Sequence, residues 1–214
     1  MKIAASLTDP KDAPAASAAG ADLIELRLDL VRGDRLAAVK ACRDLSALPL
    51  IATLRSVEEG GMYSGSPDAW FREIGPLLPH VDYVDIEQRF AVHADAIRSG
   101  DVTVIASCHM PGMPSLFELF GLERELLAFG DIPKIVVTPK NEEDIIEMIS
   151  FTHAAKKPVC TGVMGAGFRY ARLVLPLFGS EFAYCHAGTP TAEGQYSVAE
   201  VKEAMRLFGL DARV

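Results

Sequence analysis

The feature that most constrains the fold is the alternation of short apolar runs with amphipathic runs along the whole chain. Eight strand-like segments are expected at residues 2–7, 22–28, 48–54, 82–87, 102–108, 134–137, 158–163 and 182–186. Helical periodicity is found in seven intervening or following segments, at 34–45, 68–78, 91–98, 115–128, 142–155, 168–177 and 198–208. Strands that alternate with helices pair in parallel through right-handed crossovers. Eight such units favour a single-domain (β/α)8 TIM barrel over an open doubly wound α/β sheet.

The length of the chain agrees with one domain. A chain of 214 residues, half of them hydrophobic, can bury one large core, so we expect residues 1–214 to form one catalytic barrel. The four cysteines, Cys42, Cys108, Cys160 and Cys185, lack metal-ligand spacing, and we interpret them as reduced core residues.

The charge excludes some partners. A net charge of −8 without a basic patch argues against nucleic acid. No segment reaches the ~20 apolar residues of a membrane span, and the N-terminus has no signal-peptide pattern, so a cytoplasmic location without a membrane partner is expected.

Charged side chains alternate with apolar ones in the second strand. Alternation places Glu25, Arg27 and Asp29 on one face. Leu26 and Leu28 lie on the other face, which in a barrel must contact the helices. The charged face therefore points into the barrel, where buried charges need partners.

The third and fourth strands add charges to the same interior. Arg55 follows the third strand, and Asp85 and Glu87 lie on one face of the fourth. The two carboxylates have either a divalent metal or the arginines as partners. We favour the arginines, because no histidine or third carboxylate stands at a suitable spacing.

Lys134 is unusual because it lies in the β-branched run of the sixth strand. One interpretation is a lysine at the strand edge whose ammonium reaches water. The other is a buried amine that serves as a nucleophile. Arg27 and Arg55 are expected on the same interior face, and cationic neighbours together with desolvation favour a neutral amine.

His109 is the candidate acid/base residue. If Ser107 and His109 face inward on the fifth strand, Cys108 must pack against the helices and cannot be activated by His109. His186, at the end of the eighth strand, is the rival candidate.

A glycine-rich turn from Gly162 to Gly167 precedes Arg172. Glycines that open a helix near an arginine suit a small anion such as a carboxylate, although a tight turn is an equally common reason for them. The spacing is not that of a nicotinamide site. The polar loop from Thr189 to Gln195 lies on the same face and is placed to close over a ligand.

These features together resemble the type I 3-dehydroquinate dehydratases, over nearly the whole chain. The resemblance rests on an ordered set of motifs: Glu25-x-Arg27-x-Asp29, Thr53-x-Arg55, Glu59-Gly60-Gly61, Ser107-x-His109, Pro133-Lys134 with Pro139, Met164 eight residues before Arg172, Phe178-Gly179-Ser180 and Gly194-Gln195. Any one of these motifs is weak, and their order and spacing make the set specific.

The resemblance implies a homodimeric lyase of the shikimate pathway, in aromatic amino acid biosynthesis, that needs neither metal nor organic cofactor. Lys134 would form a Schiff base with the C3 ketone of 3-dehydroquinate, His109 would move protons, and Glu59 would orient His109. Residues implied to bind the substrate are Ser6, Glu25, Arg27, Arg55, Arg172, Thr191 and Gln195, of which Ser6 and Thr191 rest on the resemblance alone.

Two segments depart from the family pattern, namely Met110 to Pro114 after His109, and Glu193 in the last loop. We expect the side chain of Glu193 to face solvent. Two alternative functions remain: a Schiff-base aldolase that shares Lys134, and a barrel that binds a metabolite without catalysis. Borohydride reduction in the presence of substrate separates the second from both enzymes, because only an imine is trapped.

Overall fold

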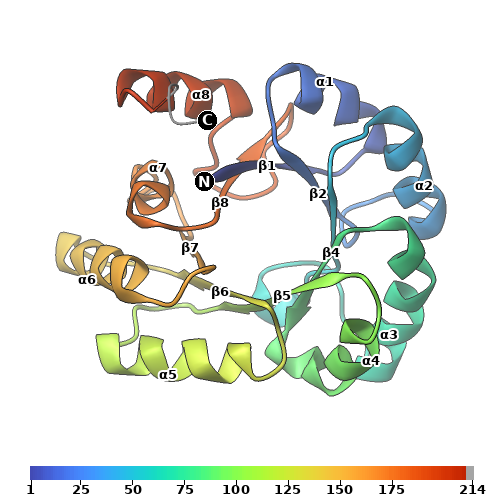
Figure 1. The fold of residues 1–214 in the computed structure, drawn as a ribbon, viewed down its shortest axis with the longest axis horizontal. Coiled ribbons are helices and arrows are strands. Elements are labelled where there is room, and N and C mark those ends of the chain that lie inside the picture. The colour runs from blue at the N-terminus through green and yellow to red at the C-terminus, as the bar shows by residue number, and fades with distance from the viewer. Residues whose placement is uncertain (211–214) are drawn as a thin grey trace.

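The computed structural model describes residues 1–210, which form a ring of eight parallel strands surrounded by helices (Figure 1). The strands are β1 Lys2–Leu7, β2 Leu23–Arg27, β3 Leu50–Thr53, β4 Tyr83–Glu87, β5 Thr103–His109, β6 Ile132–Val137, β7 Cys160–Val163 and β8 Phe182–His186. The predicted barrel and its eight strands are confirmed. Residues 211–214, the end of the predicted domain, lie outside the described residues.

The helices follow the predicted order. Their bounds are α1 Ala13–Ala18, α2 Arg35–Leu45, α3 Pro67–Ile74, α4 Ala94–Arg98, α5 Leu116–Leu127, α6 Glu142–Ala154, α7 Ala171–Val174 and α8 Val198–Leu207. The prediction contained no counterpart of α1, a short alanine-rich helix that buries Ala13 and Ala16. Such small side chains give a weak amphipathic pattern.

Three predicted helices are shorter than expected, because 3-10 turns replace part of each. The predicted helix 68–78 ends at Ile74 and continues as the 3-10 segment Gly75–His80, which contains Pro76 and Pro79. A similar segment, Gln88–His93, precedes α4, and Leu175–Phe178 follows α7. The first and third of these 3-10 segments contain prolines, which lack the N–H that α-helical hydrogen bonding needs.

The ring has one weak seam, between β7 and β8. The hydrogen-bonded order runs from β7 through β6, β5, β4, β3, β2 and β1 to β8, and a single bridge, Val159 with Ser180, spans the remaining junction. There the Ser180 hydroxyl replaces strand pairing: it accepts a hydrogen bond from the Thr161 N–H at 2.9 Å and donates one to the Thr161 carbonyl at 3.1 Å. The backbone N–H and carbonyl of Thr161 are thereby satisfied.

The inside of the ring has two levels. The first, which we call the apolar layer, consists of Ala4, Leu23, Ile51, Ile105, Ile132, Cys160 and Phe182. Two residues further along the strands lies the polar layer, which we define as Ser6, Glu25, Thr53, Asp85, Ser107, Lys134 and Tyr184. Outside the ring, larger apolar clusters fill the space between strands and helices. The polar layer thus faces the carboxyl ends of the strands, where barrel enzymes carry their active sites.

Among residues 1–210, no helix combines the length and the apolar character needed to cross a membrane.

Candidate active site

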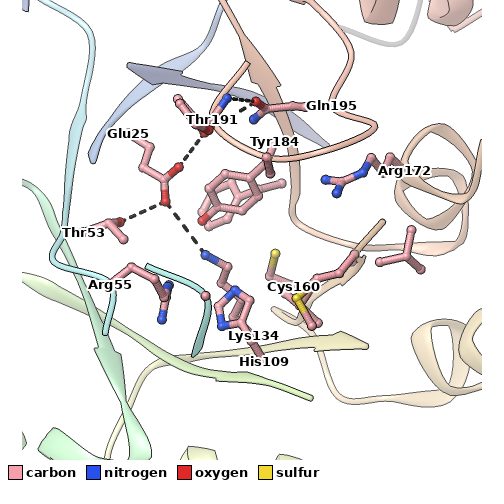
Figure 2. Close-up of a pocket in the computed structure, with 18 of the residues that line it drawn as sticks. Glu25, Thr53, Arg55, His109, Lys134, Cys160, Arg172, Tyr184, Thr191 and Gln195 are labelled. Atoms are coloured by element: carbon pink, nitrogen blue, oxygen red, sulfur yellow. Dashed lines mark hydrogen bonds and ion pairs between the residues drawn. The ribbon is translucent and has the colours of Figure 1, made fainter. Parts of the chain in front are cut away.

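A cavity of about 300 Å³ opens above the polar layer (Figure 2). All ten residues predicted for the site line this cavity: Ser6, Glu25, Arg27, Arg55, Glu59, His109, Lys134, Arg172, Thr191 and Gln195. They come from β1, β2, β5 and β6, from the segment after β3, and from the α7 and β8–α8 regions. The structure therefore brings together side chains that are up to 189 positions apart in the sequence, Ser6 and Gln195.

Lys134 is buried in the centre of the ring, with 4% of its surface exposed, so the interpretation as a strand-edge lysine is wrong. Its Nζ lies 2.8 Å from Asp85 Oδ2 and 3.9 Å from Glu25 Oε1. We predicted arginines as the charged neighbours of the amine, and this is corrected: carboxylates contact it. The side chain of Asp85 explains why carboxylates and not arginines contact the amine, because it lies between Lys134 and Arg55 and pairs with both.

Asp85 is the hub of the polar layer. It accepts hydrogen bonds from Lys134 and from Ser107 Oγ, the latter at 2.5 Å, and pairs with Arg55 Nη2 at 2.9 Å. Burial alone would raise the pKa of this carboxyl, but the attraction of Arg55 and Lys134 outweighs burial and holds it well below its usual range. Asp85 is therefore ionised throughout the neutral pH range.

Arg55 is shared by three carboxyl groups. Its Nη1 lies 2.9 Å from Glu87 Oε1 and 3.3 Å from Glu59 Oε2, while Nη2 faces Asp85. The prediction that Asp85 and Glu87 are counter-ions of the arginines is confirmed for Arg55. Burial opposes the charge of the guanidinium, but the three carboxylates outweigh it and raise its pKa. Arg55 lines the cavity, but these partners hold its guanidinium.

Arg27 and Glu25 occupy the opposite side of the cavity. Arg27 forms a two-point ion pair with Asp29, at 3.0 and 2.8 Å, and its Nη1 reaches the carbonyl of Thr191 at 3.4 Å. Glu25 accepts hydrogen bonds from Ser6 Oγ at 2.5 Å and Thr53 Oγ1 at 2.9 Å. Ser6, which only the resemblance had suggested, is thus part of the polar layer.

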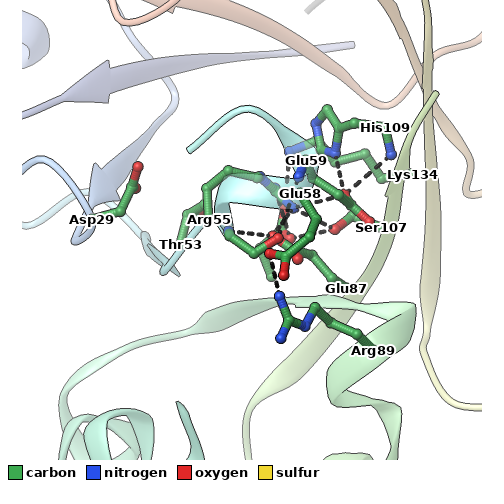
Figure 3. Close-up of polar contacts among 12 residues, drawn as sticks. Asp29, Thr53, Arg55, Glu58, Glu59, Glu87, Arg89, Ser107, His109 and Lys134 are labelled. Atoms are coloured by element: carbon green, nitrogen blue, oxygen red, sulfur yellow. Dashed lines mark hydrogen bonds and ion pairs between the residues drawn. The ribbon is translucent and has the colours of Figure 1, made fainter. Parts of the chain in front are cut away.

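Glu59 contacts His109 (Figure 3). Its Oε2 lies 2.7 Å from His109 Nδ1 and accepts the backbone N–H of His109 at 3.1 Å. The backbone explains the motif Glu59-Gly60-Gly61. Gly60 has a φ of +84°, and a Cβ on Gly61 would lie 2.2 Å from the carbonyl oxygen of Arg55. Glycine at both positions lets the 3-10 turn Val57–Glu59 place Glu59 beside the histidine.

The protonation states of this pair follow from its surroundings. Burial raises the pKa of Glu59 to about 8, and the nearby Glu87 and Asp85 add to the rise against the opposing attraction of Arg55. Burial, together with Arg55 and Lys134, lowers the pKa of His109 well below its ordinary value. The imidazole is therefore neutral at neutral pH, as a general base must be.

Arg172 faces the far end of the cavity. Its Nη2 donates to the carbonyl of Glu193 at 3.1 Å, while its buried Nε has no partner within residues 1–210. Burial, and then repulsion from Arg169, lowers its pKa, so an anion that neutralises it would be favoured. The predicted glycine turn is present, but α7 is only four residues long. The positive charge at this end of the cavity therefore comes from Arg172 and not from the N-terminus of α7.

The last loop forms the wall next to Arg172. Gln195 Oε1 accepts hydrogen bonds from the N–H of Thr191 at 2.8 Å and from its hydroxyl at 3.2 Å. Gly194 has a φ of +72°, and a Cβ there would lie 2.7 Å from the carbonyl oxygen of Gly165. The glycine turn and the last loop thus touch. The side chain of Glu193 is exposed, as predicted.

The sequence-based prediction missed two features of the cavity, and it retained His186 as an alternative acid/base residue. It did not identify Asp85 as the partner of Lys134, and it overlooked Tyr184, although alternation with Phe182 places that ring inward. His186 is half-buried and is absent from the cavity lining formed by the described residues. Cys108 packs in the outer cluster between strands and helices, as predicted.

Comparisons with known proteins identify the family. A model of the type I 3-dehydroquinase family matches residues 5–212. The 3-dehydroquinate dehydratase of Methanoregula boonei is 60% identical over 208 residues, which is 97% of this chain and 100% of that protein. The same enzyme of Methanospirillum hungatei is 38% identical, over 94% and 79% of the two chains. The crystal structure of 3-dehydroquinate dehydratase from Aquifex aeolicus has 27% identity and a TM-score of 0.85, over 97% and 99% of the chains.

Proposed function

The chain belongs to the type I 3-dehydroquinase family, and we propose that it dehydrates 3-dehydroquinate in the shikimate pathway through a Schiff base on Lys134. Its activity is that of a 3-dehydroquinate dehydratase, a hydro-lyase. The observation that carries the proposed mechanism is the buried amine of Lys134, held 2.8 Å from Asp85, in a cavity that His109 also lines.

The first step is attack of Lys134 Nζ on the C3 ketone. Counted from the ammonium form, the nitrogen gives up two of its three protons as the new C–N bond forms, and the ketone oxygen takes up two protons and leaves as water. The resulting iminium retains a positive charge at the position of the ammonium. Asp85 and Glu25 can therefore pair with both species, and the iminium is formed without loss of the counter-ions.

The next two proton transfers are assigned to His109. Its neutral imidazole takes a proton from C2, and the C–H electrons move toward the iminium to give an enamine. The imidazolium then protonates the C1 hydroxyl, which leaves as water while the enamine electrons return. Hydrolysis of the iminium releases 3-dehydroshikimate and frees Lys134. Glu59, 2.7 Å from Nδ1, stabilises the imidazolium and fixes the ring so that Nε2 faces the substrate.

Substrate orientation is assigned to the two sides of the cavity. Arg172, with Thr191 and Gln195, binds the carboxylate, and the unpartnered Nε of Arg172 supports this role. Ser6, Glu25, Arg27 and Arg55 are proposed to meet the hydroxyls. For Arg55 this contact is secondary, because three carboxyl groups already hold its guanidinium.

The test compares wild type with Lys134→Ala and with Lys140→Ala, an exposed lysine that serves as the matched control. After addition of 3-dehydroquinate, we expect the enone absorbance of 3-dehydroshikimate to rise with wild type and Lys140→Ala only. Borohydride should trap a covalent adduct in the same two proteins, and peptide mass mapping should place it on Lys134.

Three outcomes contradict the proposal in different ways. Turnover by Lys134→Ala would exclude the Schiff base, and adduct formation on another lysine would move it. Turnover that cleaves a carbon–carbon bond would favour the aldolase alternative, and an inert wild type that still binds the ligand would favour a metabolite-binding barrel.

We further propose that residues 1–214 form one catalytic domain that acts as a homodimer in the cytoplasm. Exposed apolar side chains on two neighbouring helices, Phe117 on α5 and Ile146 on α6, support a contact surface. The four free cysteines support a reducing compartment. Sedimentation velocity should give twice the chain mass of 23.1 kDa, and a monomeric mass at micromolar concentration would contradict the dimer.

A further inference from the structure

Tyr184 presents an unexplained polar group in the cavity. Its hydroxyl is buried and has no hydrogen-bond partner within residues 1–210. A buried hydroxyl without a partner costs about 1–3 kcal/mol. Arg172 Nε is a second such group in the same cavity, and the substrate carboxylate accounts for it. The hydroxyl of Tyr184 requires a different acceptor.

The ring of Tyr184 is fixed beside the nucleophile. It lies on β8, two residues after Phe182, and packs edge-to-face against that ring with centroids 6.0 Å apart and planes at 79°. Lys134 Nζ lies 4.3 Å from the centroid of the tyrosine ring. Figure 2 shows the hydroxyl directed toward the side of the cavity where Glu25 and Lys134 meet. A ketone attacked by Nζ would thus have its oxygen close to the phenol.

The charged groups that contact Nζ cannot assist the ketone oxygen. Asp85 accepts hydrogen bonds from Lys134 and Ser107, and Glu25 accepts them from Ser6 and Thr53, so both carboxyl groups act as acceptors in this network. As the amine attacks, negative charge develops on the ketone oxygen, and a donor is needed there. Arg27 and Arg55 also line the cavity, but carboxyl groups already hold both guanidinium groups. The hydroxyls of the cavity wall are therefore the candidate donors.

The other hydroxyls that line the cavity already have acceptors. Ser6 and Thr53 donate to Glu25, Thr191 has Gln195 Oε1 within 3.2 Å, and Thr161 shares a hydrogen bond with Thr152. Tyr184 is the cavity hydroxyl of residues 1–210 whose proton is not committed. Burial, and then the nearby Cys160 and Glu25, raises its pKa well above the usual value, so the phenol stays protonated.

We propose that the Tyr184 hydroxyl donates a hydrogen bond to the C3 oxygen of the substrate while Lys134 attacks, which makes Tyr184 a catalytic residue for imine formation. This inference rests on the proposed Schiff-base function. The Nζ lone pair forms the C–N bond, and the carbonyl π electrons move to the oxygen, which Tyr184 stabilises. The same hydrogen bond then holds the carbinolamine oxygen until it is protonated and leaves as water.

The test is Tyr184→Phe, which removes only the hydroxyl. Reactions with saturating 3-dehydroquinate are quenched with borohydride at successive times, and the adduct is quantified by intact-protein mass. We expect the rate of adduct formation to fall by about 10²-fold, as expected for loss of one oxyanion donor. Thermal unfolding should not occur at a lower temperature, because the substitution removes an unpartnered buried group.

The matched control is Tyr83→Phe. Tyr83 packs against the same Phe182 ring, with centroids 6.1 Å apart, but is absent from the described cavity lining, so its variant should form the adduct at the wild-type rate. A wild-type rate in Tyr184→Phe overturns the inference. A slower rate accompanied by a lowered unfolding temperature also overturns it, since that result indicates a structural role. If wild type itself traps no adduct, the proposed function fails, and the inference fails with it.

Discussion

The apolar layer and the polar layer lie in the same ring, on the same strands, only two residues apart. Ile105 and Ser107 on β5, or Ile132 and Lys134 on β6, point in the same direction and are separated by about 7 Å along the strand. In each pair the isoleucine packs among apolar side chains, whereas the residue two positions later joins a hydrogen-bonded network. A step of two residues therefore separates the part that stabilises the ring from the part proposed to react.

The comparison shows what each layer requires. The apolar layer needs only volume and shape, because dispersion and burial act without direction. The polar layer needs partners, because an unpaired buried charge is costly. Two cations, Arg55 and Lys134, contact four carboxyl groups, those of Glu25, Glu59, Asp85 and Glu87. Burial raises the pKa of one of them, Glu59, and this excess of carboxyl groups adds to the rise.

The largest expected effect comes from removing the hub of the polar layer. Asp85→Asn leaves Lys134 and Arg55 without their shared counter-ion, and we expect a loss of about 3–5 kcal/mol in the free energy of unfolding at pH 7. Urea denaturation measures this loss. Asp68→Asn, at an exposed aspartate on α3, is the control and should cost less than about 1 kcal/mol.

A second result of the same experiment depends on pH. Because the folded pKa of Asp85 is depressed, its contribution to stability is present above the unfolded pKa of about 3.9 and is lost as the pH falls toward the folded value. Wild type should therefore lose stability below pH about 4 more steeply than Asp85→Asn. Equal slopes would show that the hub does not act through its charge.

A substitution in the apolar layer should lower the stability of the fold without changing the rate of adduct formation. Ile51→Ala leaves a cavity below the reacting groups and is expected to cost about 2–5 kcal/mol in urea denaturation. At a temperature where the variant is folded, the rate of borohydride-trapped adduct formation should equal that of wild type. Slower adduct formation in a folded variant would mean that the apolar layer also affects the reaction, which would contradict the division of roles between the two layers.

A smaller effect is expected on the pH dependence of stability when Glu59, at the rim above the polar layer, is replaced. The folded pKa of Glu59 is about 8, above the unfolded value of about 4.3. The stability that the protonated group contributes is fully present below the unfolded pKa and is lost as the pH rises through the folded pKa. Glu59→Gln should thus gain stability relative to wild type between pH about 4 and 8, as measured by urea denaturation at several pH values.

The pH dependence of activity provides the second test of Glu59. Ionised Glu59 stabilises the imidazolium, so kcat/KM should rise with pH toward an apparent pKa near 8 that belongs to the Glu59–His109 pair. The rise of kcat/KM with pH should be lost in Glu59→Gln and retained in Glu58→Gln, at the exposed neighbouring position. If the rise persists in Glu59→Gln, it belongs to the titration of another group.

The smallest effect is expected outside both layers, in the last loop. Glu193 is exposed, and its side chain adds a negative charge near the proposed carboxylate site, so Glu193→Gln should raise kcat/KM by about twofold. The gain should vanish in high salt, because exposed charges are screened. A gain of tenfold or more would mean that the carboxylate turns inward when substrate binds.

Much of this molecule could be predicted from local pattern. Alternation along single strands identified the inward faces of Glu25, Asp85 and His109, because a strand has a fixed period of two and the outer face of a barrel must be apolar. The count of eight βα units identified the barrel, since parallel strands need crossover connections. Predictions failed where local pattern was weak, as in the alanine-rich α1 and the proline-containing 3-10 segments.

By itself the sequence determined the ring and the family, and eight of the ten candidate residues followed from its pattern, while Ser6 and Thr191 followed from the family resemblance alone. Only the tertiary structure decided which charges pair: that Lys134 contacts Asp85 and not the arginines, and that Arg55 is held by three carboxyl groups. It also decided that the hydroxyl of Tyr184 has no partner among residues 1–210. The physical reason is that facing inward follows from the period of one strand, whereas a pairing at 2.8 Å depends on the stagger between strands and on side-chain length. Those quantities are set jointly by the whole ring.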